Sequence, residues 1–301
     1  RPGILLSSAI KRYADFFGVA CGEKNVLFTN NDSAYETAIS LIQKGINIEA
    51  IIDNREEVDS KLSYEVKKNN IKIFKGYTVT NTFGYKRINK ISIKQLSKDG
   101  EKVVGSKINL SCDCLGVSGG WTPAVHLFTQ SGGKLKFREE DQVFIPNFYP
   151  SDQLSIGSCN GDFTLDEILI NIQKPLKEFL NIRNTEYENL EILSSSNKLK
   201  RNIWLLPSDK VLGKTKSFVD YQNDATAKDI KLALREGFRS IEHVKRYTTT
   251  GMGTDQGKLG NMHALGIISE TAGAKMGELG TTTFRPPYTP LTFGTIVGRN
   301  V

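Results

Sequence analysis

Apolar residues in the first part of the chain follow two different spacings. Short apolar runs occupy 25–29 and 48–52, which predicts two buried strands. Between them, four apolar residues recur at i, i+3, i+4 and i+7 and mark one face of a helix: Tyr35, Ala38, Ile39 and Ile42. Gly45 then ends this helix, and Asp53 follows the second strand. This strand–helix–strand pattern with a trailing acid is typical of a dinucleotide-binding unit, in which the acid holds a ribose hydroxyl.

Further periodic segments extend the α/β pattern. We expect helices over 5–17 and 62–69, strands over 71–74, 78–83, 87–95 and 107–117, and a hairpin turn at 98–101. The sequence therefore predicts an α/β fold of FAD/NAD-linked reductase-like dinucleotide domains. The expected boundaries are a connecting helix of a first dinucleotide domain at 1–21, an inserted Rossmann-like domain at 22–110, and a return to the first domain at 111–179.

The segment LSIGSCNGDFTLDEI at 154–168 holds a second transition from strand to helix. We expect a strand to end at Gly157, a loop to follow, and a helix to begin near Thr164. Free amides at a helix start favour phosphate, yet an ordinary turn explains the same residues. The segment is therefore a candidate cofactor contact, with both interpretations open.

The chain changes character after its first two thirds. Thr226 and Asp229 form a capping-box pattern ahead of a helix. Two further helices are expected over 240–247 and 261–272. The predicted boundaries in this half are a charged, Asn/Ser-rich linker carrying a short helix at 180–216, a small α-helical domain at 217–280, and an extended Pro-rich tail at 281–301.

The turn after the first strand reads TNNDSA at 29–34 and contains no glycine. In a phosphate-binding turn, glycines let the backbone approach the pyrophosphate, whereas here side chains and the charge of Asp32 occupy that space. Asp32 or Ser33 is expected to cap the following helix, with Glu36 answering as in a capping box. We therefore predict that this domain keeps the fold without binding a dinucleotide, and that Asp53 is an acid in a surface turn.

Composition narrows the functional classes only slightly. The net charge of +7 is modest and the basic residues are scattered, so solvated helix faces explain them better than nucleic-acid binding does. No apolar run reaches the length of a membrane span. The cysteines lack metal-ligand spacing and are expected to be reduced thiols of a cytoplasmic protein: Cys21, Cys112, Cys114 and Cys159. The three histidines are interpreted as structural: His126, His243 and His263.

Five stretches of the chain resemble one family. They are RPGILLSSAIKRYADFFGV, VLFTNNDSAYETA, LGVSGGWTPAVHLFTQSGG, FVDYQNDATAKDIKLALREGFRSIEHVKRYTTTGMGTDQGK and GTTTFRPPYTP, and all are similar to the alpha subunit of heterotetrameric sarcosine oxidase. The resemblance runs over nearly the whole chain and is weakest at 180–216. It implies a central fragment of a longer subunit, because the chain lacks an initiator Met, begins after the main phosphate loop of the first domain and stops where a folate-binding domain would begin.

The resemblance also implies an activity, cofactors and partners. Sarcosine oxidase demethylates sarcosine oxidatively to glycine with hydrogen peroxide, and the one-carbon unit leaves as formaldehyde or 5,10-methylene-tetrahydrofolate. The alpha subunit holds NAD in its first domain, FAD and FMN lie on the beta subunit and at the alpha–beta interface, and the other partners are the gamma subunit and a zinc-carrying delta subunit. The family's NAD contacts fall on the returning loop, which makes four residues the expected cofactor contacts here: Ser158, Asn160, Phe163 and Leu165.

The helical domain departs from a related pattern. It is similar to a ferredoxin-like module of amine and opine oxidases in which four cysteines hold a two-iron, two-sulfur cluster, and the matching positions here are Asp220, Gln222, Asp255 and Gly260. Iron–sulfur clusters need thiolate ligands. No cluster is therefore expected, and the domain is interpreted as a packing and docking domain.

A basic and hydroxyl-rich group in the same domain is a candidate flavin-facing or interface surface. Its members are Lys245, Arg246, Thr249 and Arg285, which offer charge-assisted hydrogen bonds to the FMN phosphate or anchors for a subunit interface. A solvated helix end explains them as well. No catalytic residue and no metal is assigned to the chain, and the isolated chain is not expected to be active. Two other functions stay open: a non-catalytic interaction scaffold, and a subunit of a related opine or amine oxidase.

Overall fold

The computed structural model describes residues 1–150, 152–181, 202–208, 210, 212, 214, 216–286 and 291–299. The chain divides into two compact units. Unit 1 comprises Arg1–Trp121 with Leu206–Lys210, and unit 2 comprises Thr122–Leu205 with Val211–Val301. The short helix predicted within 180–216 falls largely outside the described residues.

Unit 1 is built on a five-stranded parallel sheet, as the strand–helix–strand pattern predicts. Its strands lie in the order β1 (Ile4–Leu6), β8 (Cys114–Ser118), β2 (Asn25–Thr29), β3 (Ile48–Asp53) and β4 (Lys72–Lys75). Val26 of β2 pairs with Leu115 on one side and with Ala50 on the other. The sheet includes β1 and β8, which lie outside the predicted 22–110 domain, and the chain divides after Trp121. The assignment of 111–179 to a first dinucleotide domain stays a prediction.

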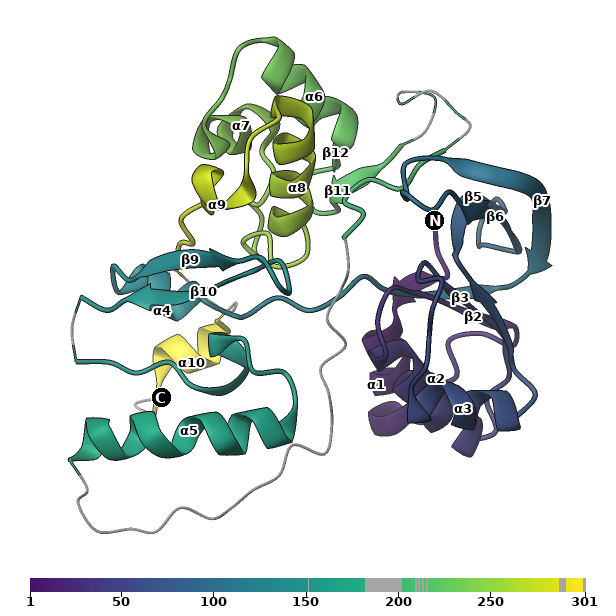
Figure 1. The fold of residues 1–301 in the computed structure, drawn as a ribbon, viewed down its shortest axis with the longest axis horizontal. Helices are drawn as coiled ribbons and strands as arrows, with labels where there is room; N and C mark the ends of the chain where they lie inside the picture. The colour runs from purple at the N-terminus through teal and green to yellow at the C-terminus, as the bar shows by residue number, and fades with distance from the viewer. Residues whose placement is uncertain are drawn as a thin grey trace. The chain divides into compact units, whose positions relative to one another are not determined.

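The two faces of this sheet are covered differently (Figure 1). Helices α1 (Ser7–Phe17), α2 (Ser33–Gln43) and α3 (Lys61–Lys68) cover one face, and an antiparallel sheet of β5 (Tyr77–Phe83), β6 (Lys90–Leu96) and β7 (Val103–Ser111) covers the other. Because side chains alternate along a strand, Leu27 and Ile51 join the core under the helices, whereas Val26 and Ile52 join the core under the second sheet. The strand predicted over 107–117 is thus two strands in two sheets, β7 and β8.

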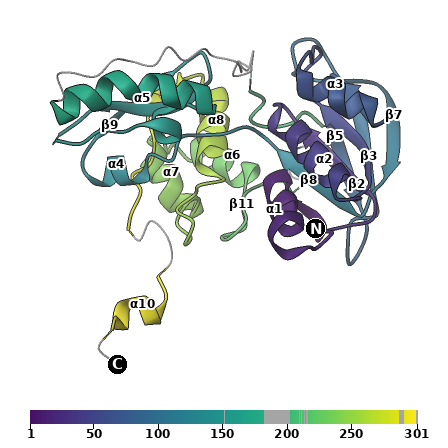
Figure 2. The same ribbon diagram turned by 90° about the horizontal axis from the view of Figure 1, so that it is seen from below.

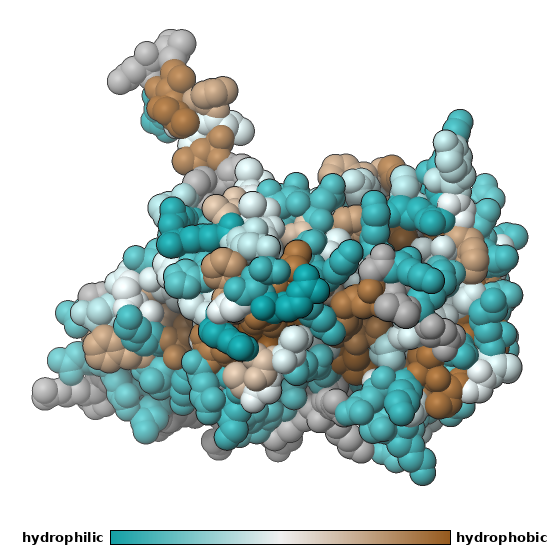
Figure 3. All heavy atoms as spheres, turned by 90° about the horizontal axis from the view of Figure 1, so that it is seen from above, coloured by the Kyte–Doolittle hydropathy of each residue, from teal (hydrophilic) through white to brown (hydrophobic). Residues whose placement is uncertain are grey.

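Unit 2 begins with α4 (His126–Gln130) and an antiparallel hairpin of β9 (Lys134–Arg138) and β10 (Val143–Phe148). The prediction of a strand ending at Gly157 is wrong, because the chain there forms a 3₁₀ turn, η1 (Gly157–Asn160). The predicted helix after it is confirmed as α5 (Leu165–Leu180), with Thr164 as its N-cap. No residue of α5 is buried, although its apolar side chains recur at helical spacing. Figure 3 shows apolar side chains at the surface among hydrophilic ones.

The helical part of unit 2 comprises a two-stranded sheet and four helices. Their bounds are β11 (Phe218–Asp220), β12 (Ala225–Thr226), α6 (Ala227–Arg235), α7 (Ile241–Thr248), α8 (Asn261–Ala272) and α9 (Met276–Leu279). The predicted capping box is confirmed: the Asp229 carboxylate accepts from the Thr226 amide at 2.9 Å, and the Asp229 amide donates back to Thr226 Oγ1 at 3.4 Å. Helices α6, α7 and α8, which lie next to one another (Figure 2), share one hydrophobic core with Phe144 of β10. The hairpin therefore belongs to the same folded body as these helices.

The remaining expectations meet mixed outcomes. The tail is irregular at 280–286, but α10 (Phe293–Val297) is a helix, so the prediction of an extended tail is wrong there. Residues 287–290, which include Pro287, lie outside the described residues. All four cysteines are free thiols, as predicted. Within the described ranges, no helix has the length and apolar character needed to cross a membrane.

Candidate functional site

The turn between β2 and α2 lies at the carboxyl edge of the parallel sheet, where this fold class binds dinucleotides. Three of its backbone amides already have acceptors in the chain. The Asn30 amide donates to the Ser118 carbonyl at 3.3 Å, the Asn31 amide to Thr29 Oγ1 at 3.0 Å, and the Ser33 amide to Asn31 Oδ1 at 3.1 Å. The turn thus stabilises itself through the side chains that replace the glycines of a phosphate-binding turn.

Asp53, at the end of β3, is fully buried, so the prediction of a surface turn acid is wrong. Its carboxylate accepts hydrogen bonds from the Tyr35 hydroxyl at 2.9 Å and from the Arg55 backbone amide at 2.9 Å. The Arg55 guanidinium adds Nε at 3.0 Å and Nη2 at 2.7 Å. A buried carboxylate requires such partners because its charge is costly to remove from water. Asp53 is therefore part of a buried ionic network.

The same network explains why the expected helix cap is absent. Asp32 occupies the N-cap position of α2 but makes no side-chain capping bond, and Ser33 is already the first residue of the helix. The Asp32 carboxylate instead accepts from Arg55 Nη2 at 2.7 Å. Burial alone would lower the pKa of Arg55, but its hydrogen bonds to Asp53 and Asp32 outweigh that effect and raise the pKa. Burial and the neighbouring Asp53 carboxylate likewise raise the pKa of Tyr35, so the hydroxyl remains a donor.

The four predicted NAD contacts lie in and after η1, where α5 begins. Ser158 and Leu165 are exposed, and Asn160 and Phe163 are half-buried. The capping box of α5 takes up two nearby amides, because the Glu167 carboxylate accepts from Phe163 and Thr164, each at 3.1 Å. Together with Asp166, Glu167 places two acids in the first turn. The negative charges of these acids offset the positive end of the helix dipole and repel a phosphate at this position.

Residues that the sequence analysis missed fix the shape of this loop. Arg138 Nη2 donates to the Gly161 carbonyl at 2.8 Å, and Arg138 also forms an ion pair with Asp141. Asn171 Nδ2 donates to Asp162 Oδ1 at 2.8 Å. Gly161 has φ +88°, and a Cβ there would lie 2.6 Å from Arg138 Nη2. Gly161 is the one sign of this tight turn that the sequence offers. No spacing rule identifies Arg138 on β9 as its partner.

Lys245 lies on the buried side of α7, and its Nζ donates to the Thr283 carbonyl at 3.2 Å. Burial lowers the pKa of Lys245, Glu242 opposes this, and Arg285 and Arg246 lower the pKa further. Three of the four predicted flavin-facing residues are therefore close enough for the charge of Lys245 to interact with those of Arg246 and Arg285.

The fourth, Thr249, ends α7. It is exposed and has a left-handed backbone, with φ +60°. Its hydroxyl donates to the Thr248 carbonyl at 2.6 Å. Arg246 and Arg285 are also exposed. The surface that these residues present is cationic, with Glu242 as the acid that partly offsets it.

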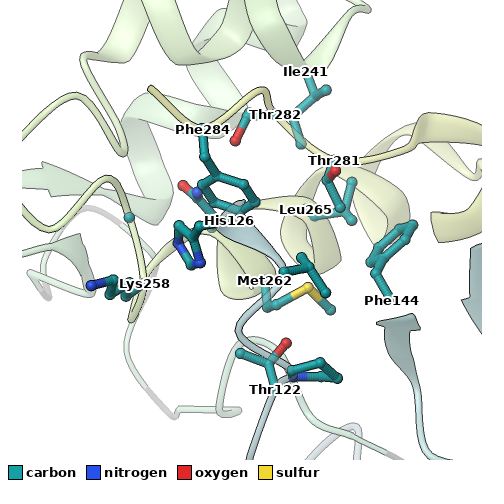
Figure 4. Close-up of a pocket in the computed structure, with 14 residues that line it drawn as sticks. Thr122, His126, Phe144, Ile241, Lys258, Met262, Leu265, Thr281, Thr282 and Phe284 are labelled. Carbon is teal, nitrogen blue, oxygen red and sulfur yellow. The ribbon is translucent and has the colours of Figure 1, made fainter. Parts of the chain in front are cut away.

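The first residues of the tail are held on the helical core by contacts that the sequence analysis did not foresee. The Thr283 amide donates to Glu242 Oε1 at 2.7 Å, so α7 binds both backbone groups of Thr283. Next to it, the Phe284 ring packs on His126, with ring centroids 3.8 Å apart (Figure 4). The two rings border a hollow of about 30 Å³ whose other lining residues include Thr282, Met262 and Leu265. That volume has room for about one or two water molecules and is far below that of a flavin or nucleotide pocket.

The positions that match cluster ligands in related modules partly meet in one loop region. The Asp220 carboxylate accepts backbone hydrogen bonds from Gln222 at 2.8 Å, Asn223 at 3.0 Å and Gly251 at 2.7 Å. These bonds lower the pKa of Asp220 in spite of its burial, which acts in the opposite direction. Gly260 packs against the Val219 carbonyl. In the part of the chain that the structure describes, no three His, Cys, Asp or Glu side chains are grouped to hold a metal ion.

Comparison with solved structures defines the class of fold. L-proline dehydrogenase from P.horikoshii aligns with a TM-score of 0.61 over 99% of this chain and 54% of its own, at 18% sequence identity. The α/β architecture with its parallel sheet agrees with this likeness. The chain therefore has the dinucleotide-binding fold of FAD- and NAD-dependent oxidoreductases, which confirms the predicted fold class.

Sequence comparison defines the relationship more closely. The chain is 32% identical over 309 residues to sarcosine oxidase subunit alpha from Rhizobium meliloti (strain 1021), which covers 99% of this chain and 29% of that protein. It is also 32% identical over 311 residues to the subunit from Corynebacterium sp. (strain P-1), covering 99% and 31%. A family model described as the sarcosine oxidase A3 domain matches residues 214–299. The chain is thus a homologue of part of the sarcosine oxidase alpha subunit, as the resemblance predicted, and it spans under a third of those relatives.

Proposed function

We propose that the chain forms part of the alpha subunit of a sarcosine oxidase and contributes NAD-binding and flavin-facing surface to that enzyme. The observation that carries the proposal is the similarity to sarcosine oxidase alpha subunits over 99% of the chain. The dinucleotide-binding fold supports a cofactor role, since sites of this kind lie at the ends of its strands and helices.

The loop at 158–165 suits a neutral part of NAD better than its pyrophosphate. Glu167 already accepts hydrogen bonds from two amides at this helix start, and Asp166 adds a second negative charge. Ser158 and Asn160 provide hydroxyl and amide groups for ribose or base edges, and Phe163 and Leu165 provide apolar contact area. We therefore assign to these four residues the nucleoside portions of NAD, and the pyrophosphate to groups elsewhere in the subunit.

The cationic surface of unit 2 suits a phosphate. The positive charge of Lys245 interacts with those of Arg246 and Arg285. Thr249 lies at the C-terminal end of α7, the helix that carries Lys245 and Arg246. A phosphate there would relieve the repulsion among the three cations and form charge-assisted hydrogen bonds. We assign this surface to the FMN phosphate at the alpha–beta interface.

The wider assignment follows from the family. The complete enzyme would oxidise sarcosine to glycine with hydrogen peroxide, in the cytoplasm, with beta, gamma and delta subunits, FAD, FMN and a tetrahydrofolate-binding domain. This chain would carry neither the amine oxidation nor folate binding. A scaffold function is the second candidate, because three turn amides of unit 1 donate hydrogen bonds within the chain.

The test is to place the chain in a full-length alpha subunit, to express it with the three partner subunits, and to measure bound NAD, bound flavin and sarcosine-dependent peroxide. We expect about one NAD per complex together with peroxide formation. Replacing Asn160 with Asp should lower the NAD content by about tenfold, since it adds a charge beside the loop. The matched control is Asn147→Asp on β10, an exposed position of the same unit.

A second variant pair separates the flavin assignment from the NAD assignment. Arg246→Met, at an exposed position on α7, should lower FMN content and leave NAD content unchanged, whereas Lys228→Met, at an exposed position on α6, should change neither. A complex that assembles with flavin but without NAD would identify the chain as a scaffold. Failure to assemble with any partner would contradict the sarcosine oxidase assignment itself.

A further inference from the structure

The carboxyl edge of the unit 1 sheet has the elements of a dinucleotide site, but the chain itself uses their binding groups. In such a site, the turn amides after one strand bind the pyrophosphate and the acid after the next strand binds the ribose. Here the amides of Asn30, Asn31 and Ser33 donate within the chain at 3.3, 3.0 and 3.1 Å. The acid, Asp53, has no exposed surface.

Arg55 connects these two halves of the site. Its Nη2 lies 2.7 Å from Asp32 Oδ1 in the turn and 2.7 Å from Asp53 Oδ2 at the strand end. Its Nε donates to Asp53 Oδ1 at 3.0 Å, and the Tyr35 hydroxyl fills a further acceptor position on Asp53. The side chains of Arg55 and Asp32 are each 19% exposed. One guanidinium thus spans from the phosphate side of the site to its ribose side.

We propose that Arg55 is a built-in occupant of the unit 1 nucleotide site, held by Asp32 and Asp53, and that it keeps this site closed to dinucleotides. The inference concerns unit 1 alone and does not depend on the sarcosine oxidase assignment. It identifies the group that closes the site, whereas the absence of glycines in the turn does not identify any such group.

The charges explain why a ligand does not displace Arg55. An incoming dinucleotide carries two negative charges on its pyrophosphate and needs the acceptor oxygens of Asp53 for its ribose. If Arg55 moved out, the buried Asp53 and the nearby Asp32 would face the pyrophosphate without their cation. If Arg55 stayed, the ribose hydroxyls would find those acceptor oxygens occupied. Either arrangement disfavours binding.

The test is a titration of the full chain with ADP-ribose and with NADH, followed by isothermal calorimetry and by NMR of the protein's own unit 1 signals, which separates this edge of the sheet from the 158–165 loop of unit 2. We expect no saturable binding to unit 1 of the wild type. The double variant Asp32→Gly, Arg55→Ala removes the bridge and one acid, and leaves Asp53 and Tyr35 able to accept ribose hydroxyls. It should bind ADP-ribose at least about tenfold more tightly than the limit measured for the wild type.

The control removes a different Asp–cation ion pair from the same unit, with the same types of substitution. Asp15 and Lys44 pair at 2.8 Å on the exposed surface of α1 and α2, so Asp15→Gly with Lys44→Ala should leave binding undetectable. A folded Asp32→Gly, Arg55→Ala protein that gains no binding would overturn the proposal. Saturable binding by the wild type that the single variant Arg55→Ala weakens would also overturn the proposal, because Arg55 would then be a ligand contact.

A measurement on the wild type decides the matter if the double variant does not fold. The Arg55 Nε–H is held by Asp53, so its NMR signal should persist at neutral pH and should not move when ADP-ribose is added. A saturable shift of that signal would show that the ligand reaches Arg55, and would refute the closed site.

Discussion

Lowering the pH from neutral to about 5 should weaken unit 2 through His126. This imidazole is 6% exposed, and burial lowers its pKa to about 4, with Lys258 acting in the same direction and Asp255 opposing. In the unfolded chain, the pKa returns to its ordinary value of about 6.5. Between these two values the unfolded chain binds a proton that the folded chain does not, so stability is full above about pH 6.5 and is lost as the pH falls.

The magnitude follows from the two pKa values. Each unit of pKa difference corresponds to about 1.4 kcal/mol, and at about pH 5 roughly 1.5 units of that difference have been expressed. His126 should therefore lower the free energy of unfolding by about 2 kcal/mol between neutral pH and about pH 5. The assay is urea denaturation at a series of pH values, together with an NMR titration of the imidazole.

The variants make this result specific. His126→Phe retains a ring against Phe284 and should remove the contribution of about 2 kcal/mol that His126 makes to the pH dependence in this window. His243→Gln, which removes an exposed imidazole of α7, should leave the pH dependence as in the wild type. If His126→Phe unfolds with the same pH dependence as the wild type, burial of this imidazole is not the cause.

Three further predictions concern stability and are each checked by urea denaturation. Tyr35→Phe removes the hydroxyl that donates to buried Asp53 and should cost about 1–2 kcal/mol; an unchanged stability would contradict the buried network. Asp220→Asn removes a charged acceptor of three backbone amides and should cost about 2–3 kcal/mol above pH 4. Because the folded pKa of Asp220 is lowered, the wild type should lose this advantage as the pH falls below about 4, and a constant difference would count against it. Ile230→Ala, fully buried on α6, should cost about 2–5 kcal/mol, whereas exposed Ile296→Ala should cost little.

The elements that could be predicted from the sequence are those specified by local periodicity. The strands near 25–29 and 48–52, the helix over 261–272 and the capping box at Thr226 depend on residues a few positions apart, and all are confirmed. The overall α/β class followed because strand–helix–strand patterns have few topological solutions. The split of 107–117 into two strands could not be read in the same way, because only the pairing in two sheets separates them.

The parts of the site that could not be predicted depend on partners distant in sequence or on competition between nearby partners. Asp32 had the residue type and position of an N-cap, but Arg55 offers its carboxylate a charged donor instead of a backbone amide. Asp53 looked like a surface acid because acids after strands usually are solvated or bind a ligand, and its burial depends on Tyr35 and Arg55 together. The contact between Arg138 and the Gly161 carbonyl joins separate elements of unit 2 that no spacing rule relates.

The order of strands in the unit 1 sheet has a consequence for how the chain folds. β8 lies between β1 and β2, yet it is the last of the five strands along the chain. Among the described strands, β1 pairs with β8 alone, so β1 has no place in the sheet until residues 114–118 are available. A nascent chain can form β2, β3 and β4 early, but it leaves one edge of β2 open, and open edges invite pairing with other chains. The sheet is therefore completed by a single late, long-range insertion, which makes folding slow and places the period of greatest aggregation risk before β8 emerges during synthesis.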